Sequence, residues 1–172
     1  MDISSNSAAS SANTFIYPLL MLTSKTFERI VKEVKQSYPK EACGIMGGVI
    51  KDGRIIVSYT SKLSNVFSEE GKFWFSELDW MHKVASLISH GLNYIGLYHS
   101  HPDSTPTPSL NDLERMIECP GEIWLILSYT PSNSLSLSIR AWTIPDFNSG
   151  LMRIPVVVNH EKFKRYTKAR YF

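Results

Sequence analysis

The stretch HSHPDSTPTPSLND, residues 99–112, decides the fold of this 172-residue chain and carries its chemistry. It follows a short apolar run, YIGLY at 94–98, which predicts a buried strand leading directly into the first histidine. The prolines inside the stretch require a loop, and a serine is a typical residue at the start of a helix. A strand, a loop and a third helix over 109–117 are therefore expected here.

The polar residues of this stretch have the spacing of a metal site. In a strand, residues i and i+2 point the same way, so His99 and His101 can face one point. If the helix begins near Ser109, then Ser109 and Asp112 share one of its faces. Two imidazoles and a carboxylate would hold a zinc ion with its fourth position open for water, which is the catalytic arrangement. Such a centre also needs a general base and a donor for the developing oxyanion.

The rest of the chain alternates between helical and strand patterns. A first helix is expected over 27–38 with Thr23 or Ser24 as its cap, and a second is expected to begin with the capping-box pattern of 76–79. The buried face of the second helix is predicted to comprise Leu78, Met81, Val84, Ala85 and Ile88. Strands are predicted over 43–50, 55–59, 73–75, 94–98, 123–128, 135–143 and 154–158, with polar, irregular chain over 60–72. This order predicts an α/β fold, a mixed sheet with helices on both faces.

Composition excludes several other classes of protein. With 43% hydrophobic and 20% charged residues, the chain is neither disordered nor a coiled coil. It has no apolar run long enough for a membrane helix, so no membrane association is expected. The net charge of +2 is too small to indicate nucleic acid. Two cysteines make no disulfide framework, and we expect a cytoplasmic protein. We expect a flexible leader over 1–14, a catalytic domain over 15–158 and a basic tail over 159–172.

The motif resembles the signature of the JAMM (MPN-plus) metalloprotease family. The resemblance covers roughly 22–145 and includes an upstream glutamate with a small, glycine-rich strand, EACGIMG at 41–47. It implies a sandwich similar to that of cytidine deaminases, with one catalytic zinc bound by His99, His101 and Asp112. It also implies that Glu41 holds the zinc water and moves its proton, and that Ser109 stabilises the tetrahedral intermediate. Family members cleave bonds after the C-terminal tail of ubiquitin or ubiquitin-like proteins, which are the implied partners.

The branch of the family is less clearly indicated. The 58 positions between Glu41 and His99 resemble the longer spacers of deubiquitinating members, including the proteasome-lid enzyme. In those, an insertion adds a strand beside the ubiquitin tail, and residues 61–72 would be that insertion here. A proteasome-like or other partner protein is a further expectation. Two alternatives stay open, namely release of cysteine from a ubiquitin-like sulfur carrier, and a non-enzymatic scaffold that binds ubiquitin-like proteins.

Simpler interpretations exist for each residue taken alone. An isolated HxH is most often a pair of loop histidines, and Ser109 also fits a plain helix cap. Cys43 is expected to be a small buried hydrophobic residue rather than a nucleophile. The chain lacks the H-x-E and P-C-x-x-C pattern of zinc deaminases and the HExxH helix of other zinc proteases.

Overall fold

The computed structural model describes residues 18–66, 73–132 and 137–159. The expected leader over 1–14, the segment 67–72 of the expected insertion, and nearly all of the expected basic tail lie outside the described residues. Within the described part, no helix is long and apolar enough to cross a membrane.

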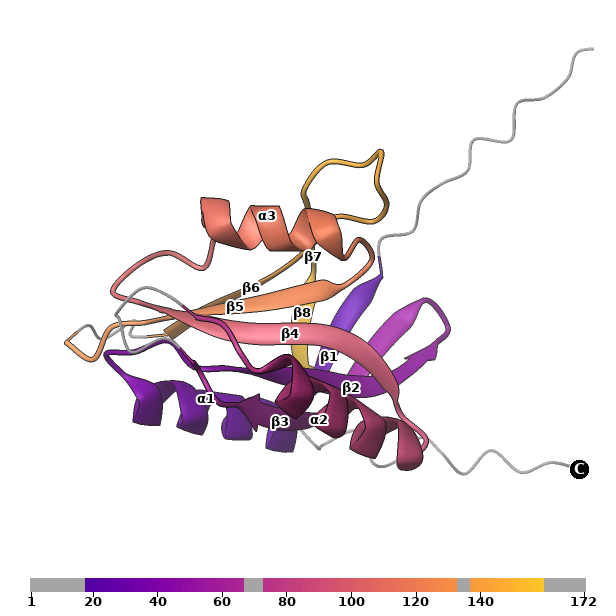
Figure 1. The fold of residues 1–172 in the computed structure, drawn as a ribbon, viewed down its shortest axis with the longest axis horizontal. Coiled ribbons are helices and arrows are strands. Elements are labelled where there is room, and N and C mark those ends of the chain that lie inside the picture. Colours follow the sequence, from indigo (N-terminus) through magenta and orange to yellow (C-terminus); the bar gives the residue numbers. More distant parts are fainter. Residues whose placement is uncertain (1–17, 67–72, 133–136, 160–172) are drawn as a thin grey trace, which may run out of the picture.

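One sheet forms the centre of the structure (Figure 1). Its strand order is β7-β6-β5-β4-β2-β3-β1-β8. The bounds are β1 Leu19–Thr23, β2 Cys43–Lys51, β3 Arg54–Leu63, β4 Asn93–Pro102, β5 Ile123–Tyr129, β6 Leu137–Thr143, β7 Met152–Ile154 and β8 Val156–Asn159. Parallel pairing joins β1 to β3 and β8, and β4 to β5, while the other neighbours are antiparallel. The predicted mixed α/β sheet is confirmed.

Within the described residues, three helices cover the two faces of the sheet. Helix α1, Ser24–Ser37, packs Ile30 and Val34 into one apolar cluster. Helices α2, Glu77–Ser89, and α3, Leu110–Glu118, contribute Leu87 and Met116 to the cluster on the opposite face. Thr23 caps α1 by accepting a hydrogen bond from the backbone of Thr26, as its position before the apolar pattern predicts.

The prediction for the buried face of α2 is wrong except for Val84, which packs against the core. The structure leaves Leu78, Met81 and Ile88 about 60% exposed and also exposes Ala85. Helix α2 instead turns Leu87 into the core, with Trp80 and Val84 beside it. The helix carries two apolar stripes, and the second faces the sheet, where the Trp80 indole donates a hydrogen bond to the Tyr94 hydroxyl on β4 at 3.2 Å.

Two strand predictions also need correction. Residues 60–63 are not irregular chain but the end of β3, because Thr60 and Leu63 are buried and pair with β2. The 73–75 segment forms a single bridge, between Phe75 and Asn65, rather than a strand. The apolar residues near the N-terminus form an additional strand, β1, which the sequence patterns did not predict.

The pairing of β2 with β4 brings the two parts of the expected site together. Cys43 on β2 lies opposite His99 on β4 in the register. Ala42, the residue before Cys43, also bonds to β4. The Ala42 backbone nitrogen donates to Ser100 Oγ at 2.9 Å, and the Ser100 nitrogen donates to the Ala42 carbonyl at 3.0 Å. Glu41 is thereby held beside the end of β4.

Candidate metal centre

The two histidines of β4 point to the face of the sheet that carries α2 and α3. His99 is fully buried and His101 is 8% exposed. Their Nε2 atoms lie 2.9 Å apart. Each also approaches the Asp112 carboxylate, His99 Nε2 at 3.4 Å from Oδ1 and His101 Nε2 at 3.3 Å from Oδ2. The three expected ligand residues therefore lie together, with their ligand atoms within 4.8 Å of one another.

The first turn of α3 fixes the Asp112 carboxylate. Ser109 is the N-cap, and the pair forms a capping box. The Ser109 backbone nitrogen and hydroxyl both donate to Asp112 Oδ2, at 2.7 and 2.8 Å. The Asp112 backbone nitrogen donates back to Ser109 Oγ at 3.2 Å. A residue at the third helical position can thus reach back towards the strand that carries the histidines.

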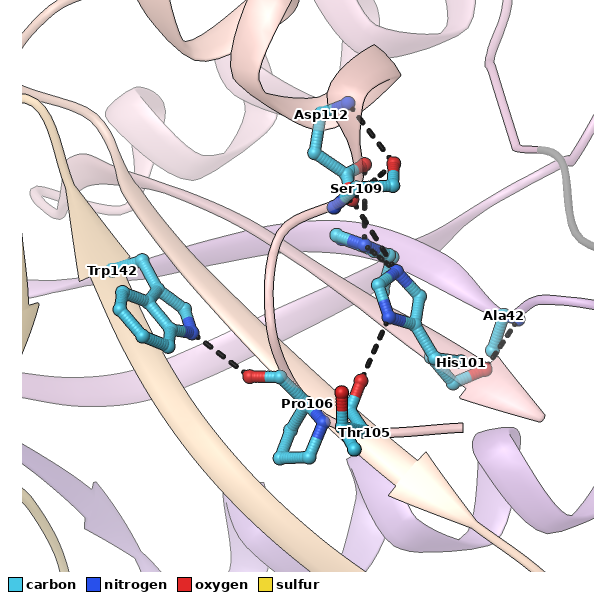
Figure 2. A network of polar contacts seen from close by, with 9 residues as sticks. Ala42, His101, Thr105, Pro106, Ser109, Asp112 and Trp142 are labelled. Carbon is cyan, nitrogen blue, oxygen red and sulfur yellow. Dashed lines mark hydrogen bonds and ion pairs between the residues drawn. The ribbon is translucent and has the colours of Figure 1, made fainter. Parts of the chain in front are cut away.

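The loop between β4 and α3 is held by side chains of the sheet (Figure 2). His101 Nδ1 lies 3.0 Å from the Thr105 carbonyl, and Trp142 Nε1 on β6 donates to the Pro106 carbonyl at 2.9 Å. A carbonyl can only accept, so Nδ1 carries the proton in this contact and Nε2 is left with its lone pair for a ligand. Such a bond to the second ring nitrogen is the usual way to orient a metal-binding histidine.

Aromatic rings enclose His99. The Phe73 ring stacks on the imidazole with centroids 4.3 Å apart, and Trp124 meets it edge-on at 5.7 Å. Among the described residues, the buried Nδ1 atom of His99 has no hydrogen-bond partner. The rings keep water away from this side of the centre.

Glu41 lies at the same centre and is 7% exposed. Burial raises the pKa of its carboxyl group, His101 opposes this and Asp112 adds to it, so that the pKa reaches about 7. The Asn65 side chain holds the Glu41 carbonyl, with Nδ2 at 3.4 Å. A carboxyl group with a pKa near neutrality can both accept and return a proton at physiological pH.

The ligand residues have electrostatics that suit a cation. Burial lowers the pKa of His99, which favours its neutral, ligating form. Although burial opposes ionisation of Asp112, the neighbouring imidazoles of His101 and His99 and the Ser109 backbone N–H hold the pKa of Asp112 well below its usual range. Burial also opposes protonation of His101, but Asp112 and the Thr105 carbonyl raise its pKa above the usual value. The ionised Asp112 carboxylate thus faces two imidazole nitrogens, and a cation at this point would balance its charge.

This donor set fits zinc. Two imidazole nitrogens and one carboxylate oxygen are the ligands of catalytic zinc sites, which leave a position open for water or substrate. The two Nε2 atoms and the Asp112 carboxylate face one another. The other ring nitrogen of His101, Nδ1, is already bonded to the Thr105 carbonyl. Among the described residues, no other group of three or more histidine, cysteine or acidic side chains has metal-binding geometry.

A pocket of about 680 Å³ opens over the centre. His101, Asp112, Ser109 and Glu41 line it on one side. Sequence reasoning did not single out Arg115, which lines another part with Trp74, or Thr105 and Trp142, which hold the loop. For Trp74 it favoured core packing over lining a groove for a peptide, and the structure shows the ring packed against the core and lining the pocket. For Arg115, a signal existed in its position three residues after Asp112, on the same helix face. The other contacts join segments far apart in the chain and leave no local pattern.

Cys43 does not take part in the centre. It is 1% exposed, as expected for a small buried hydrophobic residue, and burial raises the pKa of its thiol to about 12. A thiol with such a pKa is a poor nucleophile because almost none of it is thiolate at neutral pH.

The fold and the centre together define a class, the JAB-type hydrolases built on a mixed sheet with a His-x-His and aspartate cluster. Residues 23–144 match the model of the family described as prokaryotic homologs of the JAB domain. The chain belongs to this family and is a JAMM-type enzyme, a prokaryotic relative of deubiquitinases.

Several known proteins resemble the chain. A desampylase of Haloferax volcanii is 38% identical over 112 residues, which cover 63% of this chain and 74% of that protein. A desampylase of Pyrococcus furiosus is 25% identical, covering 87% of this chain and 98% of that protein. A CD-NTase/cGAS isopeptidase of Enterobacter hormaechei is also 25% identical, over 69% of this chain and 72% of that protein.

Solved structures share the fold. A protein from Desulfitobacterium hafniense superimposes with a TM-score of 0.69 at 24% identity, over 83% of this chain and 94% of that chain. A protein from Salinibacter ruber gives a TM-score of 0.58 at 25% identity, over 83% and 93% of the two chains.

Proposed function

We propose that this chain is a zinc-dependent peptidase and isopeptidase that cleaves the bond following the C-terminal tail of ubiquitin or a ubiquitin-like protein. The observation that carries the proposal is the convergence of His99, His101 and Asp112 beside the buried Glu41 in one open pocket. Relatives named desampylase and isopeptidase support the substrate class.

His99 and His101 would bind zinc through Nε2, and Asp112 would bind it through its carboxylate. When bound, zinc makes water acidic enough to yield a nucleophile near neutral pH and polarises a carbonyl group. The Thr105 carbonyl keeps His101 Nε2 free for this role, and Ser109 keeps the Asp112 carboxylate in place.

Glu41 would act as the general base and then as the general acid. Its carboxylate takes a proton from the attacking water and gives it to the departing amine, so that the amide bond breaks with a neutral leaving group. Its low exposure and its pKa of about 7 support this double role. The contacts of Ala42 with Ser100 fix its position relative to β4.

Ser109 would donate its hydroxyl proton to the oxyanion of the tetrahedral intermediate. In the present arrangement this proton is donated to Asp112 Oδ2, and the Ser109 backbone nitrogen donates to the same oxygen. The hydroxyl can therefore turn to the substrate while Asp112 keeps one of its two donors from Ser109.

The scope of the substrate follows from the proposed chemistry. The modifier tail would lie extended in the pocket, with its last carbonyl at the metal centre, and either a lysine amine or a C-terminal extension would leave. Release of cysteine from a sulfur-carrier protein requires the same groups and is a special case of the second reaction. A purely non-enzymatic scaffold would have no need of a complete set of ligands with a buried glutamate.

We further propose that residues 15–158 form the catalytic domain, with 1–14 as a leader and 159–172 as a basic tail, and that the protein works in the cytoplasm.

The test is a comparison of two substrates made from one modifier. One carries the modifier on a lysine side chain, and the other carries a C-terminal extension after the last glycine. Cleavage of either substrate after this glycine by the zinc-loaded protein supports the proposal. Binding without cleavage of either, over a panel of ubiquitin-like proteins and with zinc shown to be bound, would contradict the enzymatic reaction and favour a scaffold.

A further inference from the structure

Trp74 and Arg115 together form one wall of the pocket over the metal centre. Trp74 precedes α2 and Arg115 lies on α3, so this wall is built from two segments that are far apart in the chain. The Arg115 guanidinium carbon lies 3.7 Å from the centroid of the Trp74 ring. Phe75 stacks on the same indole with centroids 4.6 Å apart. The guanidinium group thus lies over an aromatic platform, in cation–π contact with the indole.

This stacking keeps the hydrogen-bonding edge of Arg115 available. An arginine stacked through its face still presents N–H groups in the plane of the guanidinium. Its ion pair is with Glu118 at 4.0 Å, between side chains that are 44% and 68% exposed. Such an exposed pair contributes little and yields readily to a better-placed acceptor.

The place of Arg115 relative to the metal centre limits what it can bind. It lies three residues after Asp112, so the two side chains are neighbours on one face of α3, with Cβ atoms roughly 5–6 Å apart. Among the described residues that line the pocket, Arg115 is the single lysine or arginine. Carboxyl groups of Glu41, Asp103 and Glu114 line the same pocket. Arg115 is therefore the one lysine or arginine of this lining to which an anionic group of a substrate can bind.

We propose that Arg115, held by Trp74, is a specificity-determining residue that binds a substrate carboxylate beside the scissile bond. This inference rests on the proposed function and specifies its substrate class. A planar guanidinium pairs with a carboxylate through two parallel hydrogen bonds. When one residue follows the modifier's last residue, the Cα atoms of the two residues are ~3.8 Å apart. The added residue therefore carries its free α-carboxylate next to the scissile bond. A lysine linked inside a protein has no free α-carboxylate, so short C-terminal extensions are the preferred class.

An acidic side chain next to the scissile bond would present the same chemical group. The test therefore uses ubiquitin and the same panel of ubiquitin-like proteins, each followed by one residue in three forms: alanine as the free acid, alanine as the amide, and aspartate as the amide. The proteins are wild type, Arg115→Gln, Arg115→Lys and the control Arg153→Gln, which removes an exposed arginine from β7. Zinc content is measured for each protein.

The free acid should be cleaved with a kcat/KM at least about tenfold above that of the alanine amide, mainly through KM, because a charge-assisted hydrogen bond is lost with the amide. Arg115→Gln should remove this preference with zinc content unchanged, Arg115→Lys should keep part of it, and Arg153→Gln should keep all of it. If the aspartate amide matches the free acid, the carboxylate is recognised on a side chain as well. No preference in wild type, or the same preference in Arg115→Gln, overturns the inference.

Binding separates this inference from the proposed function. In the Glu41→Gln background, calorimetry measures affinity for the acid and the amide with and without Arg115→Gln. If wild type cleaves none of the probes but Arg115-dependent preference for the acid persists in binding, the proposed reaction is wrong and the inference stands. If wild type cleaves acid and amide equally, the inference is wrong and the reaction stands. If the protein neither binds nor cleaves the probes, both are contradicted.

Discussion

Ser109 donates two hydrogen bonds to a single oxygen of Asp112, from its backbone nitrogen at 2.7 Å and from its hydroxyl at 2.8 Å. The residue proposed to stabilise the substrate oxyanion therefore also orients a proposed metal ligand. It is the N-cap of α3 as well. The simple reading of Ser109 as a helix cap and the catalytic reading are compatible, because the cap is what brings Asp112 back towards β4.

Replacing Ser109 should separate these roles. Ser109→Ala loses the cap and is expected to lower the free energy of unfolding by about 1 kcal/mol. It should lower kcat by roughly 100-fold, the usual cost of one oxyanion donor. Ser109→Thr keeps a hydroxyl and should restore most of the stability. Denaturant unfolding and steady-state kinetics measure the two effects, and a fully active alanine variant would remove Ser109 from the chemistry.

The raised pKa of Glu41 predicts how the stability of the metal-free protein depends on pH. Burial raises the pKa from 4.5 to about 7, so the folded protein keeps a proton that the unfolded chain loses first. The folded state is therefore favoured most below about pH 4.5, and this advantage is lost as pH rises through 7, by up to about 3 kcal/mol.

Glu41→Gln should not show this loss. We expect urea unfolding in the presence of a chelator to give the variant a higher free energy of unfolding than wild type at pH 8, and a smaller difference at pH 5. A difference that is equal at both pH values would mean that Glu41 does not titrate in this range.

The ligand cluster predicts loss of metal on single substitutions. His101→Ala removes one nitrogen ligand, and Asp112→Asn removes the charge while leaving an oxygen for the Ser109 backbone donor. Both purified variants should contain less than about one tenth of the wild-type zinc, since a three-ligand site loses a full ligand. Zinc should raise the Tm of metal-free wild type and not that of the variants. His82→Ala, at an exposed position on α2, is the control and should bind zinc normally.

Trp142 is expected to act on the metal centre through the loop. Trp142→Phe keeps the packing but loses the donor to the Pro106 carbonyl, next to the carbonyl that orients His101. Loss of such an outer contact typically weakens metal binding by roughly 10-fold or more. Competition with a chelator of known zinc affinity measures this effect. Unchanged affinity would show that Thr105 and the rest of the loop hold His101 without Trp142.

The sequence predicted those parts of the protein that depend on short-range spacing. The i, i+2 relation of His99 and His101 and the cap at Ser109 are local, and the structure places them as expected. The family resemblance added Glu41, whose approach to β4 depends on the pairing of β2 with β4.

The missed features depend on contacts between distant segments. Helix α2 carries apolar residues on two faces, and the face that packs on the sheet is fixed by tertiary contacts, among them that of Trp80 with Tyr94, which periodicity does not show. The stacking of Trp74 on Arg115 joins residues from separate elements in the same way. Spacing identifies the reacting groups of this pocket, while tertiary packing determines its walls.

The central claim is that a metal ion and Glu41 act together in hydrolysis. The most direct measurement is single-turnover cleavage of a ubiquitin-like protein with a C-terminal extension by wild type and Glu41→Gln, each zinc-loaded, chelated, and chelated with zinc restored. The account predicts cleavage after the last glycine by zinc-loaded and restored wild type, and little cleavage by chelated wild type or by Glu41→Gln with a full complement of zinc. Undiminished cleavage by zinc-loaded Glu41→Gln, or by the chelated wild type, would contradict it.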